Sequence, residues 1–255
     1  QNSGYAGFGL NGSSQGTFED NISYANDSFG FVASDEAIMT ANRNETFENS
    51  LSGFVTRESA QGTFENNLST NNTQTGFVSF QNSIMIANNN EAHHNGLHGF
   101  ATEDQSTGTF SNNLAYQNTE SGFTAFDEST MTASNNQSYE NGLHGFSAND
   151  TAQATLSNNE AYNNLNAGFR LTDSAKMEIF ANNIYNNGLS GIILTESAFA
   201  VISDNSITNN GESSIVFFKN SGGDVQNNTC SGNQWGITIK DDTNPVIGSN
   251  SCSIE

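Results

Sequence analysis

The sequence is short of proline, cysteine and positive charge: it contains one proline, two cysteines and six basic residues among 255. Acidic residues number 27, so the formal net charge is −21. Nucleic acids and anionic membrane surfaces are bound by basic patches, which this composition excludes, so we expect neither as a partner. No apolar run approaches the roughly 18 residues of a membrane-spanning helix, so we expect no membrane insertion. The chain begins at Gln1 without a signal-peptide pattern, and we interpret it as a mature secreted chain or an excised piece.

What the sequence does contain is a 23-residue repeat, which a Gly-Phe pair opens eight times and a Gly-Ile or degenerate pair opens three more times. A fixed period of this length indicates a solenoid or an array of stacked units. We therefore predict one domain over 1–255, with a partial coil over 1–6, ten coils over 7–235 and a last coil over 236–255. The copies begin at Gly7, Gly30, Gly53, Gly76, Gly99, Gly122, Gly145, Gly168, Gly191, Ser214 and Gly236.

Numbering each copy from its first residue shows which positions face the interior. Small or apolar residues recur at positions 2 and 4, at 8, at 10 and 12, and at 17. This alternation is typical of short strands separated by turns, and no segment is periodic enough for a helix. We predict an all-β fold of about eleven coils, each with three short strands.

Positions 10 and 12 of the first six copies carry a more specific pattern, because a large residue at one accompanies a small residue at the other. The pairs are Gly16/Phe18, Met39/Ala41, Gly62/Phe64, Met85/Ala87, Gly108/Phe110 and Met131/Ala133. A close-packed interior conserves volume in this way. The underlying unit is therefore a pair of coils, 46 residues long.

Asparagine occupies position 15 in all eleven copies and position 20 in the ten copies that contain it. Stacked coils lie about 4.8 Å apart, so each side-chain amide can bond the next and form a ladder. Glycosylation is the alternative, since Asn21 and Asn67 begin sequons, but the asparagines recur whether or not a sequon is present. The predicted ladder at position 15 comprises Asn21, Asn44, Asn67, Asn90, Asn113, Asn136, Asn159, Asn182, Asn205, Asn228 and Asn250.

The consensus GFxxxxSxxxTxxxNNxxYxNNGLxG resembles the right-handed parallel β-helix repeat of pectate-lyase-like folds, alginate epimerases and NosD-like sugar-binding and sugar-hydrolysing proteins. The resemblance covers the whole chain and implies a right-handed single-stranded β-helix, a scaffold shared by unrelated functions. Lyase members pair calcium-binding aspartates with a basic residue, and epimerase members use an Asp-Pro-His-Asp motif. The epimerase motif is absent, because the only proline, Pro245, follows Asn244 and precedes Val246.

Candidate catalytic residues are few, and we predict none. The one local cluster of basic residues and acids comprises Arg170, Asp173, Lys176 and Glu178, and we interpret it as a solvated salt-bridge group. His98 and His144 share position 23 two coils apart, about 10 Å, which is too far for a common metal ion. We interpret both histidines as turn and surface residues.

Position 6 is acidic on most coils and predicts a hydrated acidic edge. The alternative is Ca²⁺ shared between coils, with Asp104, Asp127, Asp150 and Asp173 as ligands, because that ion prefers hard oxygen donors. We expect no required cofactor, with calcium as the open alternative.

Position 18 is aromatic on many coils and forms a candidate binding strip of Tyr116, Tyr139, Tyr162 and Tyr185. If these side chains point outward, they could stack on sugars or contact a neighbouring solenoid. If they tuck under the leucines of position 22, they form only a satellite core, and the sequence leaves both interpretations open. Position 11 is often threonine, but positions 9 and 13 are mixed, so ice binding is the less favoured function.

Cys230 and Cys252 both occupy position 17, on the last two coils. Stacked residues have Cα atoms near 4.8 Å apart, which is within disulfide range. We predict a disulfide and hence an oxidising, extracellular setting; two free buried thiols are the alternative.

The repeat is never interrupted by the long loop that an enzyme cleft would need. We therefore predict a secreted or cell-surface structural or adhesive solenoid, whose partners are other copies of itself, stacked end to end or laterally, or cell-surface polysaccharide. A polysaccharide-binding or polysaccharide-processing β-helix is the alternative, and an ice-binding protein a more remote one.

Overall fold

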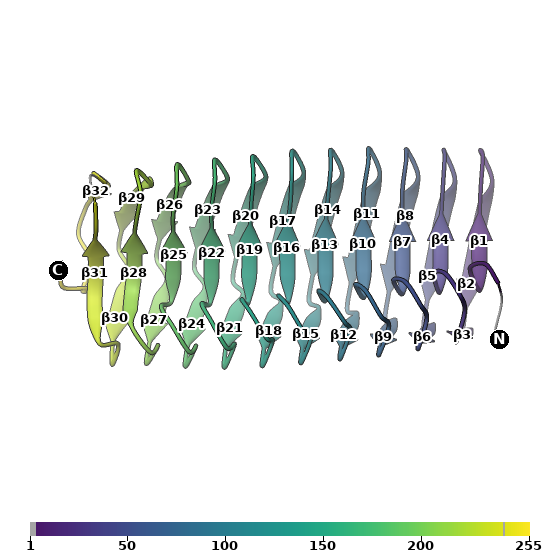
Figure 1. The fold of residues 1–255 in the computed structure, drawn as a ribbon, viewed down its shortest axis with the longest axis horizontal. Helices are drawn as coiled ribbons and strands as arrows, with labels where there is room; N and C mark the ends of the chain where they lie inside the picture. Colours follow the sequence, from purple (N-terminus) through teal and green to yellow (C-terminus); the bar gives the residue numbers. More distant parts are fainter. Residues whose placement is uncertain (1–3, 242) are drawn as a thin grey trace.

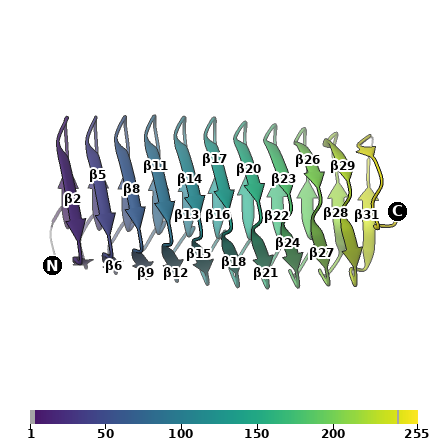
Figure 2. The same ribbon diagram turned by 180° about the vertical axis from the view of Figure 1, so that it is seen from behind.

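A computed structural model describes residues 4–241 and 243–255; the first three residues of the predicted partial coil and residue 242 lie outside it. The described residues form strands and turns with no helix, and hence no helix that could cross a membrane. The coils stack in sequence order along a rod, with the two chain ends at opposite ends (Figures 1 and 2). The predicted all-β solenoid is confirmed.

Three parallel sheets run along the rod, and each coil contributes one strand to each of them, except that the last coil adds no strand to sheet C within the described residues. Sheet A contains β1 (Phe8–Leu10), β4 (Phe31–Ala33), β7 (Phe54–Thr56), β10 (Phe77–Ser79), β13 (Phe100–Thr102), β16 (Phe123–Ala125), β19 (Phe146–Ala148), β22 (Phe169–Leu171), β25 (Ile192–Leu194), β28 (Ser213–Phe217) and β31 (Trp235–Ile239).

Sheet B contains β2 (Gln15–Glu19), β5 (Ile38–Asn42), β8 (Gln61–Glu65), β11 (Ile84–Asn88), β14 (Thr107–Ser111), β17 (Thr130–Ser134), β20 (Gln153–Ser157), β23 (Lys176–Phe180), β26 (Phe199–Ser203), β29 (Gly222–Gln226) and β32 (Val246–Ile247).

Sheet C contains β3 (Ile22–Tyr24), β6 (Glu45–Phe47), β9 (Leu68–Thr70), β12 (Glu91–His93), β15 (Leu114–Tyr116), β18 (Gln137–Tyr139), β21 (Glu160–Tyr162), β24 (Asn183–Tyr185), β27 (Ser206–Thr208) and β30 (Thr229–Ser231).

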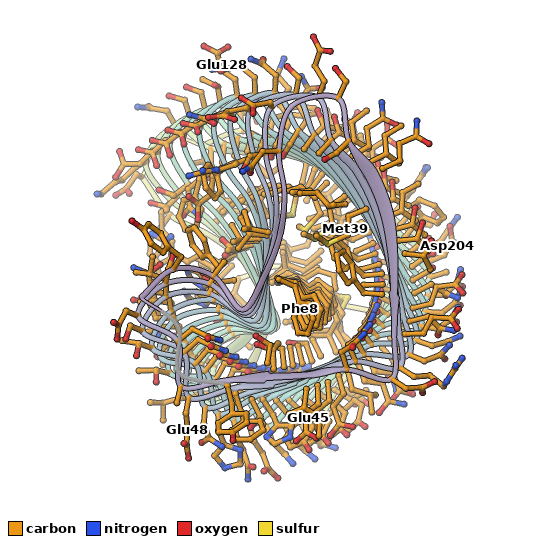
Figure 3. The ribbon with its side chains drawn as sticks, turned by 90° about the vertical axis from the view of Figure 1, so that its right-hand side faces the viewer. Phe8, Met39, Glu45, Glu48, Glu128 and Asp204 are labelled. Atoms are coloured by element: carbon orange, nitrogen blue, oxygen red, sulfur yellow. A yellow bond between two sulfur atoms is a disulfide. The ribbon has the colours of Figure 1, made fainter. Side chains whose placement is uncertain are left out.

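Register follows the repeat, so that equivalent residues of successive coils lie directly beside one another. In sheet A, Phe100 pairs with Phe123, and Phe123 with Phe146. Their rings are fully buried and stacked, with centroids 4.8 Å apart. Seen down the rod, labelled Phe8 and Met39 project into one continuous interior (Figure 3). The predicted interior file of phenylalanines is therefore present.

The alternation of large and small residues has a visible cause at Phe110. Its ring packs against the position-2 rings of two successive coils, with centroids 5.4 Å from Phe100 and 6.0 Å from Phe123. It also fills the space over position 10 of its own coil, because a Cβ on Gly108 would lie 2.7 Å from its Cζ atom. The neighbouring coils place alanine, Ala87 and Ala133, beside Phe110 in the sheet. The volume rule read from the sequence describes this packing.

Both asparagine positions form ladders that run from coil to coil. Asn136 Nδ2 donates to Asn159 Oδ1 at 3.0 Å and to Phe110 O at 2.9 Å. Its Oδ1 accepts the backbone N–H of Asn113 at 2.9 Å. The same pattern recurs at position 20, where Asn141 Nδ2 donates to Asn164 Oδ1 at 3.0 Å. The ladders satisfy backbone groups at the corners, which are otherwise orphaned inside the rod.

Candidate functional site

The outer face of sheet A is unlike an ordinary solvent-facing sheet surface, because much of it is covered. Position 3 points away from the core, yet Val32, Val55 and Val78 are at most 6% exposed. Phe29 and Phe80 pack against them from the two sides. In the view down the rod, the turn between sheets C and A projects beside sheet A and leaves this face in a recess (Figure 3). We call this recess the sheet A groove: the outer face of sheet A between the side chains of position 5 and those of positions 22 and 23.

Two pockets open along the amino-terminal half of the sheet A groove. One, of about 330 Å³, is lined in part by Phe29, Val32 and Arg57. The next, of about 320 Å³, is lined in part by Phe29, Phe80 and Glu103. They share the Phe29 side chain, so they adjoin. The floor here is apolar and the walls carry aromatic rings.

Further along, the floor of the groove becomes polar. The valines give way to Thr124, Ser147 and Arg170 at the centres of β16, β19 and β22. Ser147 Oγ donates to Thr124 Oγ1 at 2.8 Å. One coil on, the outward residue is apolar again, Ile193. The polar segment therefore spans three coils in the middle of the rod.

Arg170 is the charged group of this polar segment. It is half-buried, and its guanidinium donates to Asn149 Oδ1 at 3.1 Å. Burial lowers the pKa of Arg170, and the charges of Asp173 and Glu196 act in the opposite direction. Among the described residues, no carboxylate lies within ion-pair distance of it. A half-buried cation without a counter-ion is costly, so Arg170 can hold an anionic group of a ligand.

His98 lies at the edge of the groove and is 6% exposed, so its interpretation as a surface residue was wrong. Position 23 lies beneath the corner of the next coil, where His98 Nδ1 accepts the backbone N–H of Ser121 at 3.2 Å. Burial lowers the pKa of His98 to about 4. The Oε2 atom of Glu120 lies 3.0 Å from its Nε2 atom. The neutral ring therefore carries its proton on Nε2 and donates it to Glu120.

His144 repeats this arrangement two coils later but lacks the carboxylate. It is 8% exposed, and again not a surface residue, and its Nδ1 accepts the backbone N–H of Ala167 at 3.3 Å. Burial, and after it the charge of Arg170, lower the pKa of His144 to about 3. The place of Glu120 is taken by Asn166. The Nε2 atom of His144 has no hydrogen-bond partner within the described residues. Because every buried side-chain N or O atom of those residues does have a partner, this Nε2 atom is not buried and reaches solvent. His144 thus offers an N–H donor close to Arg170.

Glu103 is the acidic group of the groove wall. It occupies position 5 between Phe80 and Phe126 of the adjacent coils. Burial raises the pKa of Glu103, and the charges of Asp104 and Asp127 raise it further. The ring of Phe126 also contacts the ring of His98, with centroids 5.5 Å apart, so side chains of positions 5 and 23 touch at this point of the groove. A carboxyl group with a raised pKa in such a recess is suited to proton transfer.

The predicted aromatic strip lies on sheet C, and its four tyrosines are partly exposed. The rings of Tyr116, Tyr139, Tyr162 and Tyr185 stack face to face, with centroids 4.9 Å apart. Each inner ring is therefore covered on both faces by its neighbours. Sugars stack on open ring faces, so these tyrosines offer mainly their edges and hydroxyl groups.

The acidic file of position 6 has a structural role at the corner between sheets A and B. These residues have left-handed backbone geometry, with φ of 56° at Asp104 and 57° at Asp127. Each carboxylate accepts the backbone N–H of the preceding coil: Gln81 N–H donates to Asp104 at 2.9 Å, and Asp104 N–H to Asp127 at 3.1 Å. The file continues through Asp150 and Asp173. Within 4–241 and 243–255, no three His, Cys, Asp or Glu residues are arranged to hold a metal ion. Calcium binding between coils stays a prediction.

The group of Arg170, Asp173, Lys176 and Glu178 does not form the predicted salt bridges. Lys176 and Glu178 lie on β23 in sheet B and point to solvent, whereas Arg170 faces the sheet A groove. No ion pair joins these four residues, all of which the structure describes. The prediction was wrong because the corner at Asp173 places the residues on different faces. Elsewhere, Cys230 and Cys252 are joined by a disulfide, with Cα atoms 4.9 Å apart.

Sequence reasoning missed the sheet A groove because its positions vary from coil to coil. Positions 3, 5 and 23 show none of the regularity that marks the core. A signal was nevertheless present: Val32, Val55 and Val78 place apolar side chains at an outward strand position. Such a run indicates a covered face.

Comparison with known proteins agrees with this architecture. The family profile described as "Right handed beta helix region" matches residues 1–107, 82–199 and 144–254. The structure is similar to the A-module of the mannuronan C-5 epimerase AlgE4 of Azotobacter vinelandii, with a TM-score of 0.66, 17% identity, and coverage of 97% of this chain and 88% of that one. It is also similar to a double mutant of the periplasmic alginate epimerase AlgG, with a TM-score of 0.68, 11% identity, and coverage of 93% and 73%. At these identities the likeness shows the fold alone. No curated protein matches the chain.

Proposed function

Because the chain belongs to the right-handed β-helix family, we propose that it is a secreted or cell-surface rod that binds a polysaccharide strand along the sheet A groove. The observation that carries the proposal is Arg170, a half-buried cation in the groove floor without a carboxylate partner, beside the open Nε2–H of His144. The disulfide favours an oxidising compartment outside the cytoplasm.

The shape and lining of the groove favour an extended sugar chain. Phe29 and Phe80 line the pockets of its amino-terminal half, and apolar rings receive the C–H faces of sugar units. In the middle, Thr124 and Ser147 are covered, whereas Asn149 and Arg170 are partly exposed and supply an amide and a guanidinium group. Binding sites of this kind combine apolar walls with a few placed polar groups. The strands of the floor recur once per coil, which suits a ligand with repeating units.

Arg170 and His144 favour a sugar unit that bears a carboxylate. A guanidinium binds a carboxylate through two parallel N–H···O bonds, which adds both energy and orientation. The net charge of −21 opposes polyanions at long range, so recognition would depend on this local site. The similar structures are enzymes named for alginate and mannuronan, which supports a uronate-containing polysaccharide as the ligand class.

Polysaccharide processing is the second candidate function, and Glu103 is the observation that favours it. Burial raises the pKa of this carboxyl group within a pocket of the groove. A carboxyl group poised in this way can transfer protons to or from a sugar chain. Incubation with oligouronates, followed by NMR and mass analysis of the products, would detect cleavage or epimerisation.

The test of binding compares Arg170→Gln with Lys176→Gln. Each variant loses one positive charge, but Lys176 points away from the groove on β23. In calorimetric titrations, the affinity for oligomannuronate should be about tenfold to a hundredfold lower in Arg170→Gln than in the wild type. The reason is that a charge-assisted contact contributes about 1.5–3 kcal/mol. Lys176→Gln should bind as the wild type does. Equal binding by both variants, or no binding of any uronate oligomer, would overturn the proposal.

A structural or adhesive role is compatible with this proposal, because a rod that binds polysaccharide is itself an adhesive element. End-to-end assembly into filaments stays a prediction. Sedimentation of the intact chain as monomers alone would contradict it.

A further inference from the structure

A column of five stacked rings runs along the outer face of sheet C, the face from which labelled Glu45 and Glu48 project in Figure 3. It begins at His93, whose ring lies 4.7 Å from that of Tyr116 with an interplanar angle of 17°. The next three steps, from Tyr116 to Tyr185, are each 4.9 Å with angles of 7° or less. Parallel pairing of β12, β15, β18, β21 and β24 fixes this spacing. The π-systems are therefore in contact over five coils.

Tyr116 differs from the other tyrosines of the column in having a carboxylate base. Its hydroxyl group donates to Glu91 Oε1 on the adjacent strand β12. Tyr185 and Glu160 occupy the same two positions three coils further along, and their strands β24 and β21 are adjacent. No hydrogen bond links that pair, both members of which the structure describes. One end of the tyrosine column therefore has a base in contact, and the other does not.

A base in contact matters because a phenol that loses an electron becomes a strong acid. Oxidation of tyrosine at neutral pH therefore requires the electron and the proton to leave together. Glu91 is positioned to receive the proton from Tyr116, whereas Tyr139, Tyr162 and Tyr185 have no carboxylate hydrogen bond within the described chain. Burial raises the pKa of all four phenols, and to about 12 at Tyr162, so they are protonated at neutral pH.

We propose that the column is a one-electron redox relay in which Tyr116, with Glu91 as its proton acceptor, is the resting site of the radical. The oxidant is an oxygen-centred radical or another one-electron oxidant from the surroundings. It takes one electron from a ring of the column and is itself reduced by one electron. The electron hole left in that ring is transferred between stacked rings until it reaches Tyr116. There the phenolic proton transfers to Glu91, which leaves a neutral tyrosyl radical and a protonated carboxyl group.

The experiment uses azidyl radicals generated by pulse radiolysis as the oxidant of the intact chain. Tyrosyl absorbance gives the rate of the process, and rapid-freeze electron paramagnetic resonance gives the identity of the radical. In the wild type we expect one dominant radical, and its signal should be lost in Tyr116→Phe. That variant keeps the aromatic stack and loses only the hydroxyl group. In Tyr116→Phe the oxidising equivalent should distribute over the remaining tyrosines.

Glu91→Gln and Glu160→Gln form the matched pair of variants for the proton acceptor. Each removes one acid from the same strand position of sheet C. In Glu91→Gln the radical at Tyr116 should form about tenfold more slowly, equivalent to about 1.4 kcal/mol in the barrier. Glu160→Gln should leave the rate unchanged. Melting curves verify that each variant is folded. A dominant radical that survives Tyr116→Phe, or equal rates in the two glutamine variants, would overturn the proposal.

Discussion

Removal of one amide from the middle of the asparagine ladder should destabilise the rod far more than removal of one from its end. In Asn136→Ala, the backbone N–H of Asn113 loses an acceptor at 2.9 Å, and Phe110 O loses a donor at 2.9 Å. Both groups are inside the rod, and a buried polar group left unpaired costs about 1–3 kcal/mol. The two together predict a loss of about 2–6 kcal/mol in the free energy of unfolding.

The matched control is Asn21→Ala, at the amino-terminal end of the same ladder. The Nδ2 group of Asn21 donates to Glu19 O and Asn44 Oδ1, but its Oδ1 accepts nothing from a preceding coil in the described chain. A loss of about 1 kcal/mol is expected there.

Urea denaturation gives the free energies, and amide hydrogen exchange shows which coils open, because solenoids can unfold in parts. Costs for the two variants that agree within about 0.5 kcal/mol would refute the reasoning, since surface changes typically fall in that range.

Three further predictions concern the disulfide, the buried histidines and the acidic file. Reduction of Cys230–Cys252, which closes a 22-residue separation, should cost about 3 kcal/mol and should raise hydrogen exchange only around β30 and the last coil; unchanged exchange after reduction would contradict this. In the folded state the pKa values of His98 and His144 are about 4 and about 3, below the value of 6.5 in the unfolded chain. As the pH falls below 6.5, the unfolded state therefore binds more protons than the folded state. Stability should fall by about 1.4 kcal/mol per pH unit for each histidine between these values, and the double variant His98→Gln/His144→Gln should flatten that slope; parallel wild-type and variant profiles would count against it. If Ca²⁺ binds between Asp104, Asp127, Asp150 and Asp173, it should raise the melting temperature, and equal melting curves in calcium and in chelator would remove the prediction.

The fold could be predicted from the sequence because a repeat states the same information eleven times. Phe100, Phe123 and Phe146 each show that position 2 is a large buried residue, so a copy that departs from the pattern does not hide it. The asparagine ladder and the Phe110 packing follow in the same way, since both depend only on the stacking of equivalent positions. Where the physical requirement is periodic, the sequence shows it.

The candidate site could not be predicted because its residues are the departures from the repeat. Arg170 follows Val32, Val55, Val78, Ala101 and two hydroxyl residues at position 3, and nothing in its spacing shows that it faces a recess. His98 and His144 share a position with serine, threonine and alanine, so their burial depends on the corner of the next coil. What these side chains bind depends on which residues of neighbouring coils lie beside them in three dimensions. A single sequence does not show those neighbours.

The packing of Phe110 also limits how such a rod can change its length. Each ring at position 12 occupies space beside the position-2 rings of its own coil and the next. Loss or duplication of a single coil would bring two such rings into competition for the same volume, or leave two alanine coils together with a void. Gain or loss of two coils keeps the order. In the region from Phe18 to Ala133, natural length variants are therefore expected to differ by multiples of 46 residues, and an engineered extension should be added in the same steps.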